Sequence, residues 1–167
     1  MKPRGKKQPV KPQAALIRLE DLCARSEQCS FDLRRKMSQW GISSTDADNI
    51  ITQLTENRFL DDSRFARAYT RDRYLYSKWG RCKIITALYA KRIDKSTIDD
   101  ALSEIDMRRY AAIAFKAIAS KLRQMPDEMT LFEKRQRLIR FAIGRGYETS
   151  LISRILESSR LWQSSQE

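Results

Sequence analysis

The chain has 167 residues, with 33 lysines and arginines against 21 acidic residues, so its formal net charge is +12. Such an excess favours a polyanionic partner, most often nucleic acid, or an acidic protein groove, although a merely soluble positive surface is the simpler explanation. No apolar run is long enough to cross a bilayer and no secretory signal is apparent, so we expect a soluble cytoplasmic protein without a membrane partner.

The residue types that common catalytic and metal sites require are missing or scattered. The chain has no histidine, and its three cysteines lack the spacing of metal ligands. We therefore expect reduced thiols in a reducing compartment and no metal site. The five glycines form no phosphate-binding loop. The sequence accordingly predicts neither an enzyme nor a bound cofactor.

The first part of the chain is predicted to be a basic arm followed by three helices. Residues 1–12 carry five basic residues among three prolines, which is typical of a disordered arm that can touch phosphates. Apolar residues then recur at helical spacing from residue 13 to near Glu27. Ser30 is the expected N-cap of a second helix that ends at Gly41, and Ser43 or Ser44 opens a third.

A short junction at residues 58–69 leads into the next group of helices. Phe59 and Leu60 are apolar, and Asp61 and Asp62 stand where the next helix must begin. We predict that this Asp pair caps that helix, because carboxylates there accept hydrogen bonds from its first N–H groups. A metal-binding or acid–base pair is the alternative, but the chain offers it no partner residue. The helix is expected to run to Ser77 with the following residues on its buried face: Phe65, Ala66 and Tyr69.

Further helices follow in the same order. After a turn at residues 78–80, one helix is expected to stop around Arg92, and another opens between Asp94 and Ser96. A long apolar stripe follows and breaks at Pro126. Thr130 and the glutamate three residues later form a capping box for the next helix.

Three groups of helices repeat one apolar pattern. Adding 51 carries seven apolar positions of the first group onto seven of the second, and a further 54 reaches the third, where six stay apolar and Gly146 aligns with Gly41. The aligned sets are Leu33, Met37, Ile42, Ala47, Ile50, Ile51, Leu54; Ile84, Leu88, Ile93, Ile98, Ala101, Leu102, Ile105; and Leu138, Ala142, Tyr147, Ile152, Ile155, Leu156, Ser159. We predict an all-α protein of three tandem three-helix repeats in an elongated, curved, right-handed or similar helical array. The repeats span residues 13–57, 58–106 and 107–160, with a C-terminal tail at 161–167.

Basic side chains concentrate on the middle helix of each repeat. If the repeats stack in register, these side chains form one positive strip suited to DNA or an acidic protein surface. The alternative is an ordinary solvated surface with acidic partners one turn away, such as Asp32 with Lys36. The predicted binding residues are Arg34, Arg35, Lys36, Arg71, Arg73, Arg81, Lys83, Lys91, Lys134, Arg135, Arg137 and Arg145.

Aromatic residues offer a weaker signal. Tyr74, Tyr76 and Trp79 precede Arg81 and could stack on bases, although rings of this size more commonly pack between helical units. Helix-turn-helix readers also use three-helix units. The candidate recognition helices carry few Asn or Gln side chains for base edges, so the sequence gives little support for reading a specific duplex.

Three segments resemble the RecX regulatory proteins: Phe59-Leu-Asp-Asp-Ser-Arg-Phe-Ala, Ser30-Phe-Asp-Leu-Arg-Arg-Lys-Met, and the Arg135 to Tyr147 segment, which closes with Phe141-Ala-Ile-Gly-Arg-Gly-Tyr. The similarity spans roughly residues 14–157. Arg58 and Arg92 depart from it, because the family commonly has glycine there.

The resemblance implies tandem three-helix repeats and a monomeric modulator, usually an inhibitor, of the RecA recombinase. Such a protein lies in the groove of the RecA filament on single-stranded DNA. It limits filament extension, ATP hydrolysis, recombination and the co-protease role of the filament in the SOS response. Nonspecific duplex binding is left open. The leading alternative is a nonspecific DNA-binding protein without a recombinase partner, and a further one is a transcription regulator.

Overall fold

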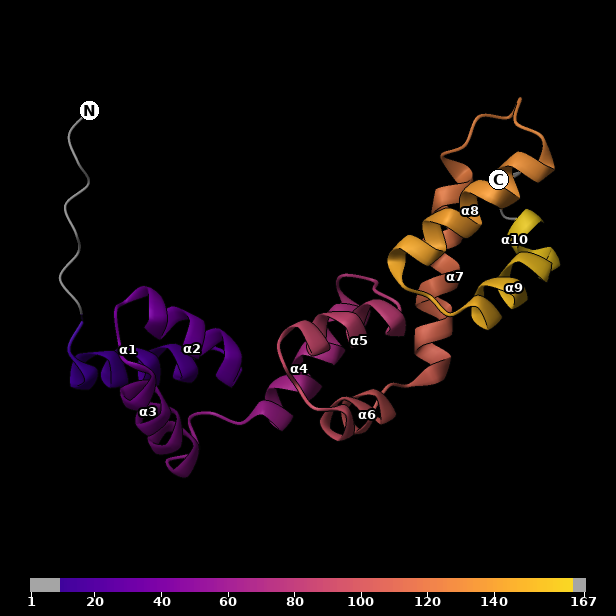
Figure 1. The fold of residues 1–167 in the computed structure, drawn as a ribbon. Coiled ribbons are helices and arrows are strands. Elements are labelled where there is room, and N and C mark those ends of the chain that lie inside the picture. The colour runs from indigo at the N-terminus through magenta and orange to yellow at the C-terminus, as the bar shows by residue number, and fades with distance from the viewer. Residues whose placement is uncertain (1–9, 164–167) are drawn as a thin grey trace, which may run out of the picture. The chain divides into compact units, whose positions relative to one another are not determined.

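The computed structural model describes residues 10–163; most of the expected basic arm, residues 1–9, and residues 164–167 of the tail lie outside this range. Within it, every regular element is an α-helix (Figure 1). The all-α prediction is therefore confirmed. The chain divides into two compact units, Met1–Phe65 and Ala66–Glu167, which are described in turn.

The first unit contains α1 (Pro12–Arg25), α2 (Ser30–Gln39) and α3 (Ser44–Glu56). Val10 packs against its core, and the Val10 N–H donates to the Trp40 carbonyl over 3.1 Å. The packed chain therefore starts before residue 12, where the basic arm was expected to end. The core consists of Ala15, Leu16, Leu19, Leu33, Met37, Ala47, Ile50, Leu54 and Leu60.

Helix ends in the first unit follow local capping chemistry. The Ser43 side chain accepts the Asp46 N–H and caps α3, as one of the two predicted alternatives requires. At α2 the N-cap position belongs to Cys29, and Ser30 is the first helical residue. The prediction that Ser30 is the N-cap is therefore wrong by one position. The Asp62 carboxylate accepts the hydrogen bonds from Ser30 at the start of this helix.

The second unit holds most of α4 (Asp62–Leu75) and six further helices. Helix α4 ends two residues before the predicted Ser77. Residues 159–163 form a short helix whose Leu161 is fully buried, so the helical chain continues past residue 160, where the tail was expected. The six helices are α5 (Arg81–Ala90), α6 (Lys95–Ser103), α7 (Met107–Arg123), α8 (Leu131–Arg145), α9 (Thr149–Glu157) and α10 (Ser159–Gln163).

The repeated apolar positions form the cores of both units. Ile42 and Ile51 are partly buried and Ser159 is exposed, whereas every other member of the three aligned sets is buried. The Thr130 capping box predicted for α8 is present. Three-helix repeats in the described chain thus bury the same positions each time, which is why the spacing of apolar residues survives across them.

In each repeat, the residue at the same aligned position after the middle helix has a left-handed backbone conformation and ends that helix. Gly41, Arg92 and Gly146 have φ values of 76°, 58° and 85°. The next N–H then donates to the carbonyl five residues earlier, the closure of a Schellman motif; these pairs are Ile42 to Met37, Ile93 to Leu88 and Tyr147 to Ala142. Arg92 therefore carries an L side chain in a backbone conformation that favours glycine, and so does Arg58, whose φ is 61°.

Candidate nucleic-acid interface

Five side chains of the second unit alternate as cation and ring. The Lys91 Nζ lies 5.9 Å and the Arg73 Cζ 4.6 Å from the centre of the Tyr69 ring. On the Trp79 ring, the Arg73 Cζ lies at 4.9 Å and the Lys83 Nζ at 4.6 Å. We call Lys91, Tyr69, Arg73, Trp79 and Lys83 the cation–aromatic ladder.

Local sequence brings the ladder together. Tyr69 and Arg73 are four residues apart on α4, so they share one face of the helix. Trp79 lies in the loop after α4, where its N–H donates to the Arg73 carbonyl over 3.0 Å. Lys83 follows in the first turn of α5, and Lys91 is the C-cap of the same helix. The ladder therefore spans both ends of α5.

The ladder has the chemistry of a surface for a flexible polyanion. It contains three cations and no carboxylate, so it can attract phosphates. A cation above a ring is stabilised by the ring's π electrons while its charge is kept. Aromatic rings with neighbouring cations are the usual platform for single-stranded nucleic acids, because every base has a face that can stack.

A groove of about 470 Å³ lies beside the ladder, between α5 and α8. Its lining is mainly apolar and small, and Ile143 on α8 is 56% exposed. Trp79 and Lys83 belong to both the ladder and the groove. The lining residues are Trp79, Cys82, Lys83, Thr86, Ala87, Ala90, Ile143, Gly144 and Gly146.

Backbone contacts hold the loop before α5 against the end of α8. The Gly80 N–H donates to the Arg145 carbonyl over 2.8 Å, and the Cys82 N–H donates to the Gly146 carbonyl over 3.0 Å. A Cβ on Gly80 would lie 2.1 Å from the Gly146 carbonyl carbon. Only glycine permits such an approach, so this contact fixes the position of Trp79 and Lys83 against α8.

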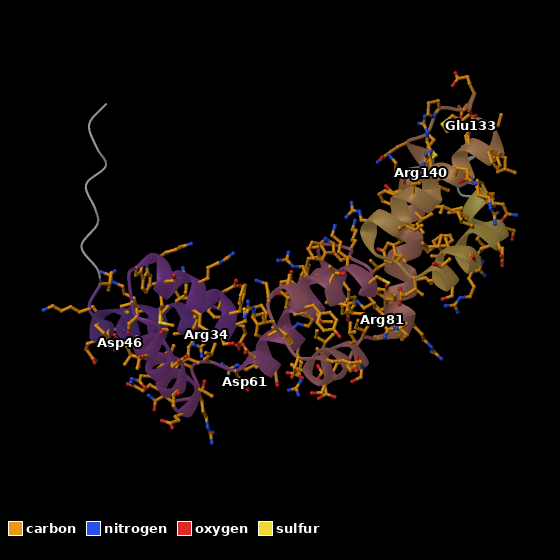
Figure 2. The ribbon with its side chains drawn as sticks, viewed as in Figure 1. Arg34, Asp46, Asp61, Arg81, Glu133 and Arg140 are labelled. Atoms are coloured by element: carbon orange, nitrogen blue, oxygen red, sulfur yellow. The ribbon has the colours of Figure 1, made fainter. Side chains whose placement is uncertain are left out.

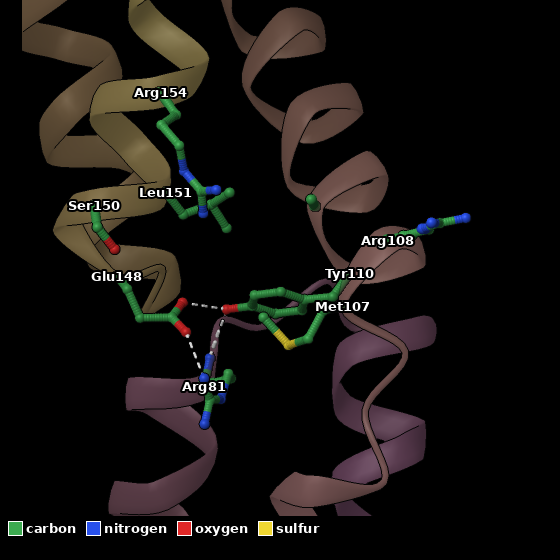
Figure 3. A pocket seen from close by; sticks show the side chains of 9 residues that line it. Arg81, Met107, Arg108, Tyr110, Glu148, Ser150, Leu151 and Arg154 are labelled. Atoms are coloured by element: carbon green, nitrogen blue, oxygen red, sulfur yellow. Dashed lines mark hydrogen bonds and ion pairs between the residues drawn. The ribbon is translucent and has the colours of Figure 1, made fainter.

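Arg81 lies in a second cluster, which joins the start of α5 to α7 and to the residue before α9 (Figure 3). The Tyr110 hydroxyl accepts the Arg81 N–H over 2.9 Å and donates to Glu148 Oε2 over 2.5 Å. The Arg81 guanidinium reaches Glu148 Oε1 at 3.4 Å. Burial, followed by the hydrogen bond to Glu148, raises the pKa of the fully buried Tyr110 well above its usual range. Arg81, predicted to bind a partner, thus makes internal contacts.

Several predicted binding residues also have partners inside their own unit. Figure 2 places Arg34 in the first unit, where it pairs with Asp48. Arg35 reaches Asp32 at 3.3 Å. In the second unit, Arg71 lies 3.8 Å from its neighbour Asp72. Exposed pairs of this kind contribute little to stability and leave the cations accessible.

The other predicted cations lie on α2, on α8 and in the ladder region. The Arg145 guanidinium donates to the Ser77 carbonyl over 3.1 Å. Arg135 approaches the Leu156 carbonyl at 3.5 Å. Lys36 and Lys134 are half-buried, and Arg137 is exposed. Of the predicted set, the structure brings together Arg73, Lys83 and Lys91, with Arg145 bound to the loop beside them.

The aromatic residues differ from expectation in their roles. Tyr74 is buried and its ring lies 6.4 Å from that of Tyr110, which agrees with packing between helices. Tyr76 is 78% exposed. Tyr69 was assigned to a buried face, yet it is half-buried and forms part of the ladder. Its position four residues before Arg73 was the signal that could have revealed this role.

The two carboxylates of the predicted cap act on different helices. Asp61 Oδ1 accepts the N–H groups of Ser63 and Arg64 at 2.8 and 3.0 Å, in the first turn of α4. Asp62 instead accepts the Ser30 N–H at 2.8 Å and the Ser30 Oγ–H at 2.6 Å, at the start of α2. Asp62 therefore joins the beginning of α4 to the beginning of α2.

Other kinds of site receive no support within residues 10–163. The described acidic and cysteine side chains include no group of three or more placed to hold a metal ion. None of the described helices combines the length and apolarity needed to cross a membrane. The cysteines in this part of the chain form no disulfide.

Comparisons with known proteins agree with the helical repeats. A family model described as the second three-helix domain of RecX matches residues 61–102. The regulatory protein RecX of Neisseria meningitidis serogroup A is 26% identical over 149 residues, covering 89% of this chain and 93% of the relative. RecX of Lactococcus lactis is 29% identical over 134 residues, but this chain spans only 50% of its length. RecX of Clostridium perfringens strain 13 is 32% identical over 118 residues, covering 70% of this chain and 55% of that protein.

Solved structures share the fold. A crystal structure of regulatory protein RecX superposes with a TM-score of 0.79 at 22% identity, covering 88% of this chain and 73% of the other. RecX from Lactobacillus salivarius gives a TM-score of 0.76 at 18% identity, with coverage of 87% and 94%. Fold and surface together define an all-α protein of repeated three-helix units with a cationic, aromatic face. The chain belongs to the RecX family.

Proposed function

We propose that this protein regulates RecA filaments on single-stranded DNA and that its main effect is inhibition. The observation that carries the proposal is the cation–aromatic ladder, because its alternating charges and rings suit an extended polyanion better than a small ligand. The relatives are named regulatory proteins, which favours a binding role over catalysis. We further propose that the protein acts as a monomer in the bacterial cytoplasm.

The proposed mechanism is occupation of the filament groove. Lys83, Arg73 and Lys91 lie against the phosphates of the filament's DNA or against acidic protein surface, and many shallow contacts hold the bound chain in place. A bound chain then obstructs the addition of further RecA subunits and the closure of subunit interfaces. Filament extension, ATP hydrolysis, recombination and co-protease activity in the SOS response decrease together.

The test is ATP hydrolysis by RecA on saturating single-stranded DNA, titrated with this protein at two salt concentrations. Inhibition at amounts well below one protein per DNA-binding site supports action on the filament. Inhibition that requires coating of the DNA and disappears with modest salt would instead support the alternative, a nonspecific DNA-binding protein without a recombinase partner.

A matched pair of variants assigns the effect to the ladder. The ladder variant replaces Arg73, Lys83 and Lys91 with glutamine and is expected to weaken inhibition. The control variant makes the same replacement at Lys116, Arg123 and Arg160, which are exposed on other parts of the second unit. Both variants lose three positive charges, so equal inhibition by the two would show that net charge, not the ladder, carries the activity.

A further inference from the structure

We infer that the groove between α5 and α8 accepts a nucleobase of single-stranded DNA while the ladder cations hold the adjoining phosphates. The inference rests on the proposed function in taking single-stranded DNA as the ligand. It adds a base-binding subsite within this chain that does not depend on RecA.

The shape of the groove suits a flat, mostly apolar group. Its lining includes Ala87, Ala90 and Gly144, which have a methyl side chain or none and take up little of the space. Ile143 is 56% exposed on the α8 side and supplies a second apolar contact. The volume of about 470 Å³ lies within the usual range for small-ligand clefts, roughly 300–1,000 Å³. A base that displaces Lys83 from the Trp79 ring can stack there whatever its identity.

The charges around the groove favour a chain in which anions and rings alternate. No carboxylate lines the groove, and Lys83 is one of its lining residues. From Lys83 the ladder continues through Trp79 and Arg73 to Tyr69 and Lys91, so cations and rings succeed one another. Single-stranded DNA has the complementary order of phosphate and base. An acidic protein segment is the competing occupant, and the experiment below separates the two.

The first experiment compares two DNA probes on this 167-residue chain without RecA. Fluorescence anisotropy measures binding to labelled oligothymidylate and to an abasic oligonucleotide of the same length, which keeps the phosphates and lacks the bases. We expect oligothymidylate to bind about 10-fold more tightly, from stacking of one base. Equal affinity for the two probes would overturn the inference, because it would leave phosphate attraction as the whole interaction.

Substitutions at Gly144 test the groove itself. A Cβ at this position meets nothing within 4 Å, so a side chain there begins in open space. Gly144→Leu is expected to fill the groove and to remove most of the preference for oligothymidylate while leaving the abasic affinity unchanged. Ala112→Leu, at an exposed position on α7 outside the groove, is the matched control and should behave as the natural chain. Trp79→Leu should also reduce the preference, by removing the stacking surface.

The outcomes separate this inference from the proposed function. If Gly144→Leu weakens RecA inhibition and leaves binding to both DNA probes unchanged, the groove accepts a protein segment and the inference is wrong. If the natural chain prefers oligothymidylate in a Gly144-dependent way but does not affect RecA, the base subsite stands and the proposed function fails.

Discussion

Gly146→Ala should destabilise the protein strongly, because two separate features of this position require glycine. The backbone has φ of +85°, which costs an alanine about 1–2 kcal/mol. The new Cβ would also lie 2.3 Å from Lys83 Cβ and 2.5 Å from Lys83 N, so α5 and α8 must separate. Overpacking of that kind costs about 1–3 kcal/mol. Reduced freedom of the unfolded chain offsets about 0.4–1 kcal/mol, which leaves a net loss of about 3 kcal/mol.

The assay is urea unfolding followed by circular dichroism, with Gly144→Ala as the control. Gly144 lies inside α8 and its added Cβ meets open space, so this alanine should stabilise the protein by up to about 1 kcal/mol through helix propensity. The same substitution two residues apart should therefore have opposite effects. Unfolding free energies that agree within about 0.5 kcal/mol, the usual spread for neutral surface changes, would refute the argument for a tight Gly146 contact.

Three other changes test separate parts of the fold. Burial raises the pKa of Tyr147 to about 12, so the folded chain keeps the Tyr147 proton at a pH where the unfolded chain has lost it. The stability that is present below pH 10 should therefore fall between pH 10 and 12. Tyr147→Phe should make that fall less steep by up to about 1.4 kcal/mol per pH unit, as measured by urea unfolding at several pH values. Asp62→Ala should cost about 1–2 kcal/mol, because it removes both hydrogen bonds to Ser30; an unchanged urea midpoint would contradict this role. Arg58→Gly should raise the melting temperature slightly, since relief of left-handed strain of about 1 kcal/mol exceeds the added freedom of the unfolded chain; a clear decrease in melting temperature would contradict it.

The candidate interface was only partly predictable. Arg73, Lys83 and Lys91 stood out as basic residues on exposed helix faces, and Trp79 as an aromatic beside them. Their alternation depends on a loop that folds back after α4, so no helical period could reveal it. The number of charges also gave Arg81 the same weight as Lys83, since sequence alone does not show that the Arg81 guanidinium pairs with Glu148, 67 residues along the chain.

The sequence by itself determined the helices and their repetition. Apolar residues at helical spacing, with Ser43, Thr130, Gly41 and Gly146 at helix ends, are local signals whose chemistry acts within a few residues. These signals were sufficient for the all-α repeats, because each repeat buries the same positions.

Only the tertiary structure decided which residues meet across the repeats. The contact of Gly80 with Gly146, the hydrogen bonds of Tyr110 with Arg81 and Glu148, and the reach of Asp62 to Ser30 all join residues more than 25 positions apart. Such contacts depend on the packing angle between helices, which a one-dimensional pattern of apolar and charged residues does not specify. For the same physical reason, the sequence indicated a basic surface, and the fold selected the cations and rings that form the ladder.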